Sequence, residues 1–168
     1  MKRISVLMIA MLLLISSLTM AQEQTITNLK VETATEAKEI VGLDITDPNV
    51  ILINGNQRGG SRPNIEHEWS DGDYSWDGNT TVQGGILYAN KYWSDFSSGD
   101  MGVENVSADS LTLKIYKRGF LFDSVVITLS IPAYTTKYYN LTGFDSSDDY
   151  YVFFTSTGLV DTAGYVSK

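Results

Sequence analysis

The second half of this chain alternates apolar and polar residues at every second position, which is the spacing of half-buried β-strands. In Leu111–Lys117, leucine and isoleucine alternate with threonine, lysine and tyrosine, and Ser124–Ile131 repeats the pattern. Because successive side chains of a strand point to opposite faces of a sheet, each segment offers one face to a core and one to solvent. Val125 and Ile127 are expected on the inner face. Lys117-Arg118-Gly119 can turn the chain, so the two strands are expected to form a hairpin.

Short segments of strand-forming residues occur over most of the chain. From residue 45 onward, short runs of β-branched and aromatic residues are separated by Gly, Asp, Asn and Ser. Strands are expected at 50–53, 65–69, 81–89, 111–117, 124–131, 137–141 and 150–156, with a further piece near Tyr165. Seven or eight short strands predict an all-β fold. We expect a single antiparallel β-sandwich over residues 45–168, of the immunoglobulin/fibronectin-like or jelly-roll-like type.

The order of elements in the second half carries a resemblance. The hairpin is followed by a Tyr-x-Leu-x-Gly-like turn at residues 139–143 and by a strand that starts Tyr150-Tyr151-Val152. This order is similar to the closing strands of extracellular immunoglobulin-like or fibronectin-like modules. The resemblance covers residues 111–156 and lacks the Cys and Trp spacing of immunoglobulin domains. It implies a fold and no function, because such sandwiches serve many functions.

The first 21 residues predict a cleavable secretory signal peptide. Lys2 and Arg3 form a positive start, residues 4–18 form an apolar run, and Thr19-Met20-Ala21 forms a small-x-small cleavage pattern before Gln22. The apolar run has about 15 residues, whereas a membrane-spanning helix needs about 20, so cleavage is favoured over a permanent anchor. We therefore expect a secreted, extracellular protein.

The mature chain is expected to be acidic, and it has no cysteine. Loss of Lys2 and Arg3 with the leader leaves 10 Lys and Arg against 20 Asp and Glu, so the net charge falls from -8 to -10. This charge disfavours nucleic acid as a partner, and no later stretch is apolar enough for a membrane span. The absence of Cys excludes disulfides and a lipid-modified cysteine and favours a bacterial source. Residues 22–44, rich in Thr, Glu, Ala and Lys, are expected to form a flexible arm or pro-segment.

Six aromatic residues crowd into residues 69–93, between Asp, Asn and Gly. They are Trp69, Tyr74, Trp76, Tyr88, Tyr92 and Trp93. Carbohydrate-binding modules place rings in this way, because rings stack on the apolar faces of sugars while Asp and Asn bind hydroxyl groups. The same rings could equally fill the core of a sandwich. The sequence leaves both interpretations open.

Oxygen-bearing side chains stand at every second position from Asp71 to Asn79, with Ser75 in the middle, and the candidate metal ligands among them are Asp71, Asp73, Asp77 and Asn79. Calcium takes several such oxygens from one short turn, so a calcium ion that steadies the glycan site is one interpretation. An EF-type loop would need Gly where Trp76 stands and Glu where Val82 stands. The alternative is a pair of tight turns, Asp71-Gly72 and Asp77-Gly78, on either side of a short strand. Calcium is the one cofactor that the sequence suggests.

No set of catalytic residues is recognisable. His67 is the only histidine, Cys is absent and no Gly-x-Ser-x-Gly elbow occurs, which argues against nucleophile relays and multi-histidine zinc sites. Glu66 and Glu68 remain as carboxylates for a small glycan hydrolase, because the sequence does not fix their distance to other acids. The loop at 54–63, which contains Arg62, is expected to be a surface connection, with anion or partner binding as its alternative.

These features together predict a function by binding. An exported, acidic, β-rich chain without a catalytic set is expected to be a secreted, non-enzymatic binding or interaction protein at the cell surface or in the extracellular medium. Its partner would be an extracellular protein, a glycan or a second copy of the chain. The first alternative is a carbohydrate-binding module that uses the aromatic cluster 69–93, with or without calcium. A secreted toxin or bacteriocin and a small glycan hydrolase are further alternatives.

Overall fold

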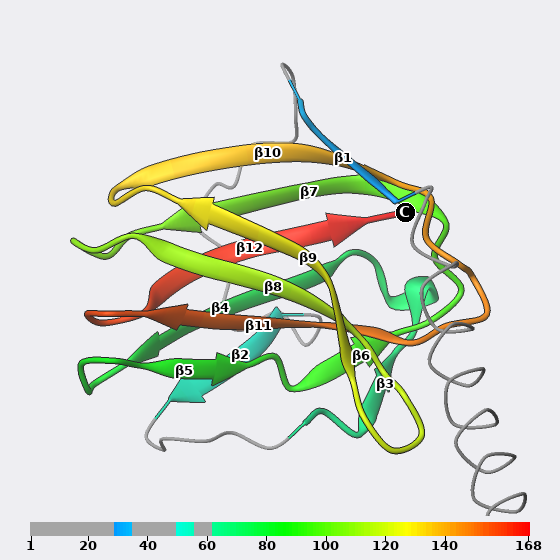
Figure 1. The fold of residues 1–168 in the computed structure, drawn as a ribbon, viewed down its shortest axis with the longest axis horizontal. Coiled ribbons are helices and arrows are strands. Elements are labelled where there is room, and N and C mark those ends of the chain that lie inside the picture. The colour runs from blue at the N-terminus through cyan, green and yellow to red at the C-terminus, as the bar shows by residue number, and fades with distance from the viewer. Residues whose placement is uncertain (1–28, 35–49, 56–61) are drawn as a thin grey trace, which may run out of the picture.

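The computed structural model describes residues 29–34, 50–55 and 62–168, and the signal peptide and most of the expected arm lie outside these residues. The described chain is all-β, and its strands form two sheets that pack as a β-sandwich (Figure 1). The one helical element described is a 3-10 turn, η1 (Trp69–Asp71). None of the described residues forms a helix that is long and apolar enough to cross a membrane.

The first sheet, sheet A, has the strand order β1-β10-β7-β12-β4-β2. Its strands are β1 (Lys30–Thr33), β2 (Val50–Gly55), β4 (Tyr74–Thr80), β7 (Ser98–Asn105), β10 (Thr135–Thr142) and β12 (Asp161–Ser167). Neighbours run antiparallel except β2 and β4, which are parallel. β1 lies inside the segment that the sequence predicts as a flexible arm, yet it pairs with β10 along all four of its residues.

The second sheet, sheet B, has the order β3-β6-β11-β8-β9, and β5 also pairs with β11. Its strands are β3 (Ile65–His67), β5 (Ile86–Tyr88), β6 (Lys91–Trp93), β8 (Leu111–Lys117), β9 (Ser124–Ile131) and β11 (Tyr150–Ser156). β3 and β6 are parallel. The expectation of a purely antiparallel sandwich is therefore wrong for two pairs. In both cases the chain visits the other sheet between the paired strands and so can return in the same direction.

The core lies between the two sheets and is filled by alternate residues of their strands. Leu111, Leu113 and Ile115 of β8 are fully buried, as the alternation predicts. The aromatic part of the core comes from four strands and two loops, and it consists of Tyr74, Trp76, Trp93, Phe96, Tyr139, Phe144, Tyr150 and Phe154. Large rings thus bury apolar area in a domain that has no disulfide.

β9 departs from strict alternation near its start. The register with β8 shifts between Ile115, which pairs with Ile127, and Tyr116, which pairs with Val125. The extra residue, Val126, packs against the core, whereas Val125 is 41% exposed. The expected inward position of Val125 is wrong because a bulge sets two residues against one and reverses the alternation beyond it.

Two local expectations in the first half of the chain are also wrong. The turn expected at Asp77-Gly78 is the middle of β4, where Gly78 pairs with Ile53 of β2 and Thr162 of β12. The strand expected at 81–89 begins only at Ile86, because residues 81–84 bend. Pairing on both sides of β4 overrides the local turn preference of Asp-Gly, as tertiary context often does in sheets.

Candidate functional site

The outer face of sheet B carries four aromatic side chains in a row. Phe153 and Tyr151 alternate along β11 with core residues, so they point away from the core. In register, Phe153 lies opposite Tyr88 of β5, and Tyr151 lies opposite Tyr116 of β8. We call these four residues the aromatic stripe.

Ring contacts join all members of the aromatic stripe. The ring centroids of Tyr88 and Phe153 are 4.8 Å apart, and those of Tyr116 and Tyr151 are 5.3 Å apart with the rings nearly parallel. Two diagonal contacts, at 6.1 Å from Tyr88 to Tyr151 and 5.8 Å from Tyr116 to Phe153, complete the set. Tyr151 is buried and the other three rings are partly exposed. The aromatic stripe is therefore a surface of rings that pack against one another and are partly accessible to solvent.

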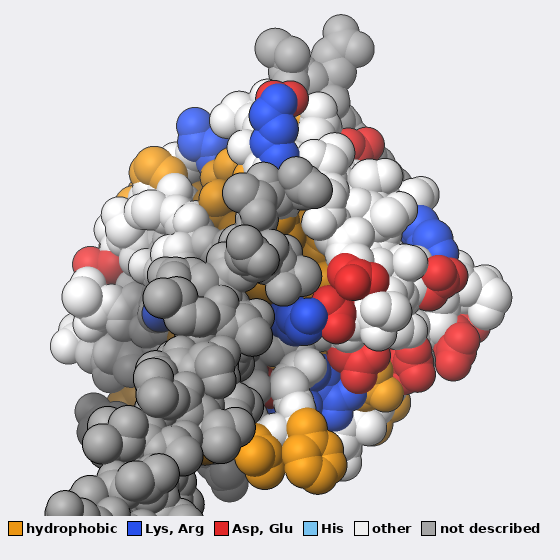
Figure 2. All heavy atoms as spheres, turned by 45° about the vertical axis from the view of Figure 1, so that its right-hand side comes forward, with side chains coloured by type: hydrophobic (Ala, Val, Ile, Leu, Met, Phe, Trp, Pro, Cys, Tyr) orange, Lys and Arg blue, Asp and Glu red, His pale blue; other side chains and the backbone are white. Residues whose placement is uncertain are grey.

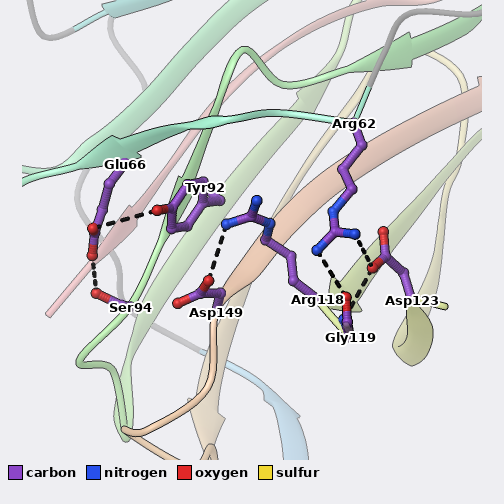
Figure 3. Close-up of polar contacts among 8 residues, drawn as sticks. All are labelled: Arg62, Glu66, Tyr92, Ser94, Arg118, Gly119, Asp123 and Asp149. Atoms are coloured by element: carbon purple, nitrogen blue, oxygen red, sulfur yellow. Dashed lines mark hydrogen bonds and ion pairs between the residues drawn. The ribbon is translucent and has the colours of Figure 1, made fainter. Parts of the chain in front are cut away.

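A carboxylate anchors one end of the stripe. Asp123, just before β9, accepts a hydrogen bond of 2.8 Å from the Tyr151 hydroxyl and one of 3.0 Å from the backbone N–H of Gly119. Arg62 lies 3.2 Å from the same carboxylate, and it also donates to the carbonyl of Gly119 at 3.1 Å (Figure 3). Arg62 precedes β3, so this network ties one edge of sheet B to the loop between β8 and β9.

The hydroxyl groups of Tyr88 and Tyr151 stay protonated at neutral pH. Burial raises the pKa of Tyr151, and the hydrogen bond to Asp123 raises it further. Burial also raises the pKa of Tyr88, to which Tyr116 and Asp123 add. At neutral pH, Tyr151 therefore keeps donating to Asp123, and Tyr88 offers a neutral hydroxyl group that can donate and accept hydrogen bonds.

A second polar group lies at the same end of the sheet. The guanidinium carbon of Arg118 lies 3.7 Å from the ring centroid of Tyr92, within the range of a cation–π interaction. Arg118 also donates to Asp149 at 3.0 Å, and Tyr92 donates to Glu66 at 3.4 Å (Figure 3). Ser94 donates to the same Glu66 carboxylate.

One donor in this group is left without a partner. Nε of Arg118 is buried and makes no hydrogen bond to any described residue. A buried donor without a partner is costly, and ordered water or a ligand oxygen commonly satisfies it.

The structure divides the six aromatic residues of the cluster 69–93 between core and surface. Tyr74, Trp76 and Trp93 are fully buried. Trp69 is half-buried, stacks on Phe96 with centroids 5.6 Å apart and donates to the carbonyl of Ser94 at 2.7 Å. Tyr88 joins the stripe, and Tyr92 lies beside it under Arg118. Three rings of the cluster are therefore core residues, and Tyr88 and Tyr92 are partly exposed.

Three members of the stripe lie outside that cluster. Tyr116 could have been found, because it stands on the polar side of the alternation in β8. Tyr151 and Phe153 gave no such signal, since the Tyr-Tyr-Val-Phe-Phe run of β11 is apolar on both faces.

The four oxygen-bearing side chains considered for calcium are not brought together. Asp71 lies in η1 and Asp73 follows it, whereas Asp77 and Asn79 lie on the outer side of the extended strand β4. Six residues of extended chain span about 20 Å. Among the residues that the structure describes, no three His, Asp or Glu side chains form a group that could hold a metal ion.

His67 is a core residue in the structure. It is buried, its Nε2 donates to the carbonyl of Gly72 at 3.1 Å, and its ring meets the edges of Trp69 and Tyr74. Nδ1 has no hydrogen-bond partner among the described residues. Burial lowers the pKa of His67, because the charged form loses its hydration.

Acidification is expected to destabilise the fold through His67. Below a pH of about 6.5, His67 takes up a proton in the unfolded chain but resists protonation in the folded protein. The free energy of unfolding therefore decreases as the pH is lowered below about 6.5. Melting temperatures measured at mildly acidic and neutral pH should differ less in His67→Gln than in the parent. An equal pH dependence in both proteins would show that His67 contributes nothing.

Comparison with known proteins assigns no relative. No protein-family model, no curated protein and no solved structure matches the chain.

Proposed function

We propose that the mature protein is a secreted, non-enzymatic binding protein that holds a glycan on the aromatic stripe. The observation that carries the proposal is the row of four rings in mutual contact on one sheet face, three of them partly exposed. Aromatic faces match the apolar C–H faces of sugars, and a few placed polar groups fix orientation.

The surroundings of the stripe supply those polar groups. Tyr88 offers a neutral hydroxyl group, and Lys114 lies opposite Phe153 in register. The stripe crosses three neighbouring strands, and strands are about 4.8 Å apart, so it measures about 10 Å across. This size suits a short stretch of oligosaccharide.

We also infer that the sandwich is a jelly roll. Four antiparallel pairs are nested along the chain, namely β4 with β12, β5 with β11, β7 with β10 and β8 with β9. Nested pairs in two sheets are what the winding of a jelly roll produces, and lectin domains are among the proteins that use it. The winding is compatible with glycan binding, while the site itself has to carry the function.

Removal of two rings tests the proposed function. The mature chain, starting at Gln22, would be screened against a panel of polysaccharides by affinity electrophoresis, and bound glycans would be titrated calorimetrically. An aromatic contact is worth about 0.5–1.5 kcal/mol, so Tyr88→Ala with Tyr116→Ala should weaken binding by about tenfold or more. Both side chains are on the outer face, so the fold should remain.

Tyr138→Ala is the matched control. Tyr138 is a partly exposed tyrosine of β10 next to the core residue Tyr139, and it faces outward on sheet A. Its loss should leave glycan affinity unchanged. Unaltered affinity in the double variant, or no retention of the parent protein by any glycan, would overturn the proposed function.

A further inference from the structure

Four large apolar side chains protrude at the two ends of one strand. Phe120, Leu121 and Phe122, in the loop before β9, are 99%, 75% and 87% exposed, and Tyr134, in the turn after β9, is 73% exposed. These are the most exposed large apolar side chains among the described residues. We call Phe120-Leu121-Phe122 the apolar tip. The loop that carries it projects beyond the two sheets (Figure 1).

β9 itself is an edge strand, and its pairing is interrupted near its start by the bulge opposite Ile115 and Tyr116. It closes sheet B at one end, and within the described residues it is paired with β8 alone. Its eight residues contain no charged residue and no proline. An exposed edge offers a row of unpaired N–H and C=O groups, and natural proteins guard such edges with Lys, Pro or very short strands. The opposite edge, β3, has three residues.

We propose that β9 pairs antiparallel with β9 of a second copy of the chain, forming a two-fold symmetric dimer. Antiparallel pairing brings the start of one strand to the end of the other, so the apolar tip of each copy meets Pro132 and Tyr134 of its partner. One symmetric contact then covers all four protruding side chains and the open edge together. No like charges face each other along the strand, because β9 has none.

The charge beside the tip disfavours an anionic lipid surface as the occupant. Arg118 at the base of the loop binds Asp149 through both its backbone and its side chain, and Lys117 pairs with Asp148. Asp145 adds an exposed carboxylate in the same loop as these two acids. Figure 2 shows acidic side chains gathered on this end of the molecule beside protruding hydrophobic ones. Because these basic side chains are paired with carboxylates, the rim offers an anionic membrane little electrostatic attraction.

The dimer has a consequence for the proposed glycan site. The two-fold axis of an antiparallel strand pair is normal to the sheet, so the outer faces of both copies lie on the same side. If the proposed function holds, two aromatic stripes face one surface, which increases avidity for a polymeric glycan. The dimer itself does not depend on that function.

Sedimentation velocity of the mature chain over a wide concentration range tests the proposal. A concentration-dependent dimer is expected. Thr128→Glu should weaken the dimer by about tenfold or more, because Thr128 lies near the middle of β9, where two copies of the new charge would meet. Within one copy the glutamate would lie opposite Lys114, so the fold is retained. Phe120→Ser with Phe122→Ser should weaken the dimer similarly, because the apolar contact with the second copy is lost. The fold should remain, since both side chains are exposed in the monomer.

Disulfide trapping tests the strand direction, because the natural chain has no Cys. Thr128→Cys alone should form a covalent dimer on mild oxidation. Phe122→Cys and Tyr134→Cys should cross-link to each other when mixed and each much less to itself. Asn79→Cys, exposed on sheet A, is the control that should stay monomeric. A parent protein that is monomeric throughout, that associates only with anionic vesicles, or whose dimer survives both the Thr128 and the tip variants overturns the proposal.

Discussion

Replacement of Trp76 with alanine is expected to lower the free energy of unfolding by about 3 kcal/mol. Trp76 is fully buried, and its ring lies 5.5 Å from that of Phe154 in the opposite sheet. Its ring also fills the space over Gly164, where an added Cβ would clash with the indole. Loss of the ring would leave a cavity between the sheets. The indole N–H has no hydrogen-bond partner among the described residues, so its removal offsets part of the loss and keeps the value at the lower end of the range for Trp→Ala.

Urea unfolding followed by far-ultraviolet circular dichroism would measure this change without relying on tryptophan fluorescence. Trp69→Ala is the comparison, since Trp69 is only half-buried and should cost less. A domain of this size has a free energy of unfolding of about 5–15 kcal/mol, so the loss at Trp76 should be plain in the transition midpoint. A change below about 1 kcal/mol at Trp76, or a larger one at Trp69, would contradict the account of the core.

Asp123→Ala is expected to cost about 2 kcal/mol, the second-largest effect predicted here. The hydroxyl of the buried residue Tyr151 would lose its acceptor, which carries most of this value. The ion pair with Arg62 adds little, because Arg62 is more than a third exposed and solvent screens it. The N–H of Gly119 would lose its partner as well, which loosens the loop that carries the apolar tip.

Two further variants separate these contributions. Asp123→Asn keeps an acceptor for Tyr151 while it removes the charge, so it should cost about half as much. Asp95→Ala removes an exposed carboxylate that pairs with Lys168, and such surface pairs are worth about 0–1 kcal/mol. Equal costs for Asp95→Ala and Asp123→Ala in urea unfolding would show that Asp123 is an ordinary surface charge.

The pattern of apolar residues predicted three strands of sheet B from the sequence alone. β8, β9 and β11 have the expected bounds, because each presents a regular apolar face or a continuous apolar run. The bulge in β9 could not be predicted from the sequence, because it arises from the register with β8 and not from the residue types of β9 itself.

β7 could not be predicted, and the reason is physical. Its sequence, Ser-Gly-Asp-Met-Gly-Val-Glu-Asn, contains two glycines and resembles a loop. In the sheet it lies between β10 and β12 and pairs with both over most of its length. Hydrogen bonds from two neighbours hold a segment of low strand propensity extended, and those neighbours come from later in the chain.

The candidate site, like β7, depends on pairing between strands that are distant in sequence. The sequence pointed to aromatic residues at 69–93 and so included Tyr88 and Tyr92. The stripe also needs Tyr116 and Tyr151, which are far from Tyr88 in sequence and reach it only through the pairing of β5, β11 and β8. Proximity along the chain therefore identified the residue type, while strand order decided which rings share a surface.

If the outer face of sheet B holds the ligand, as we propose, an NMR titration tests this most directly. Amide resonances of the mature protein would be assigned and followed as a glycan from the polysaccharide panel is added. The account predicts that shifts concentrate on β5, β8 and β11 around the aromatic stripe and at Arg118. Shifts concentrated on β7, β10 and β12 of sheet A, or none with any glycan of the panel, would contradict it.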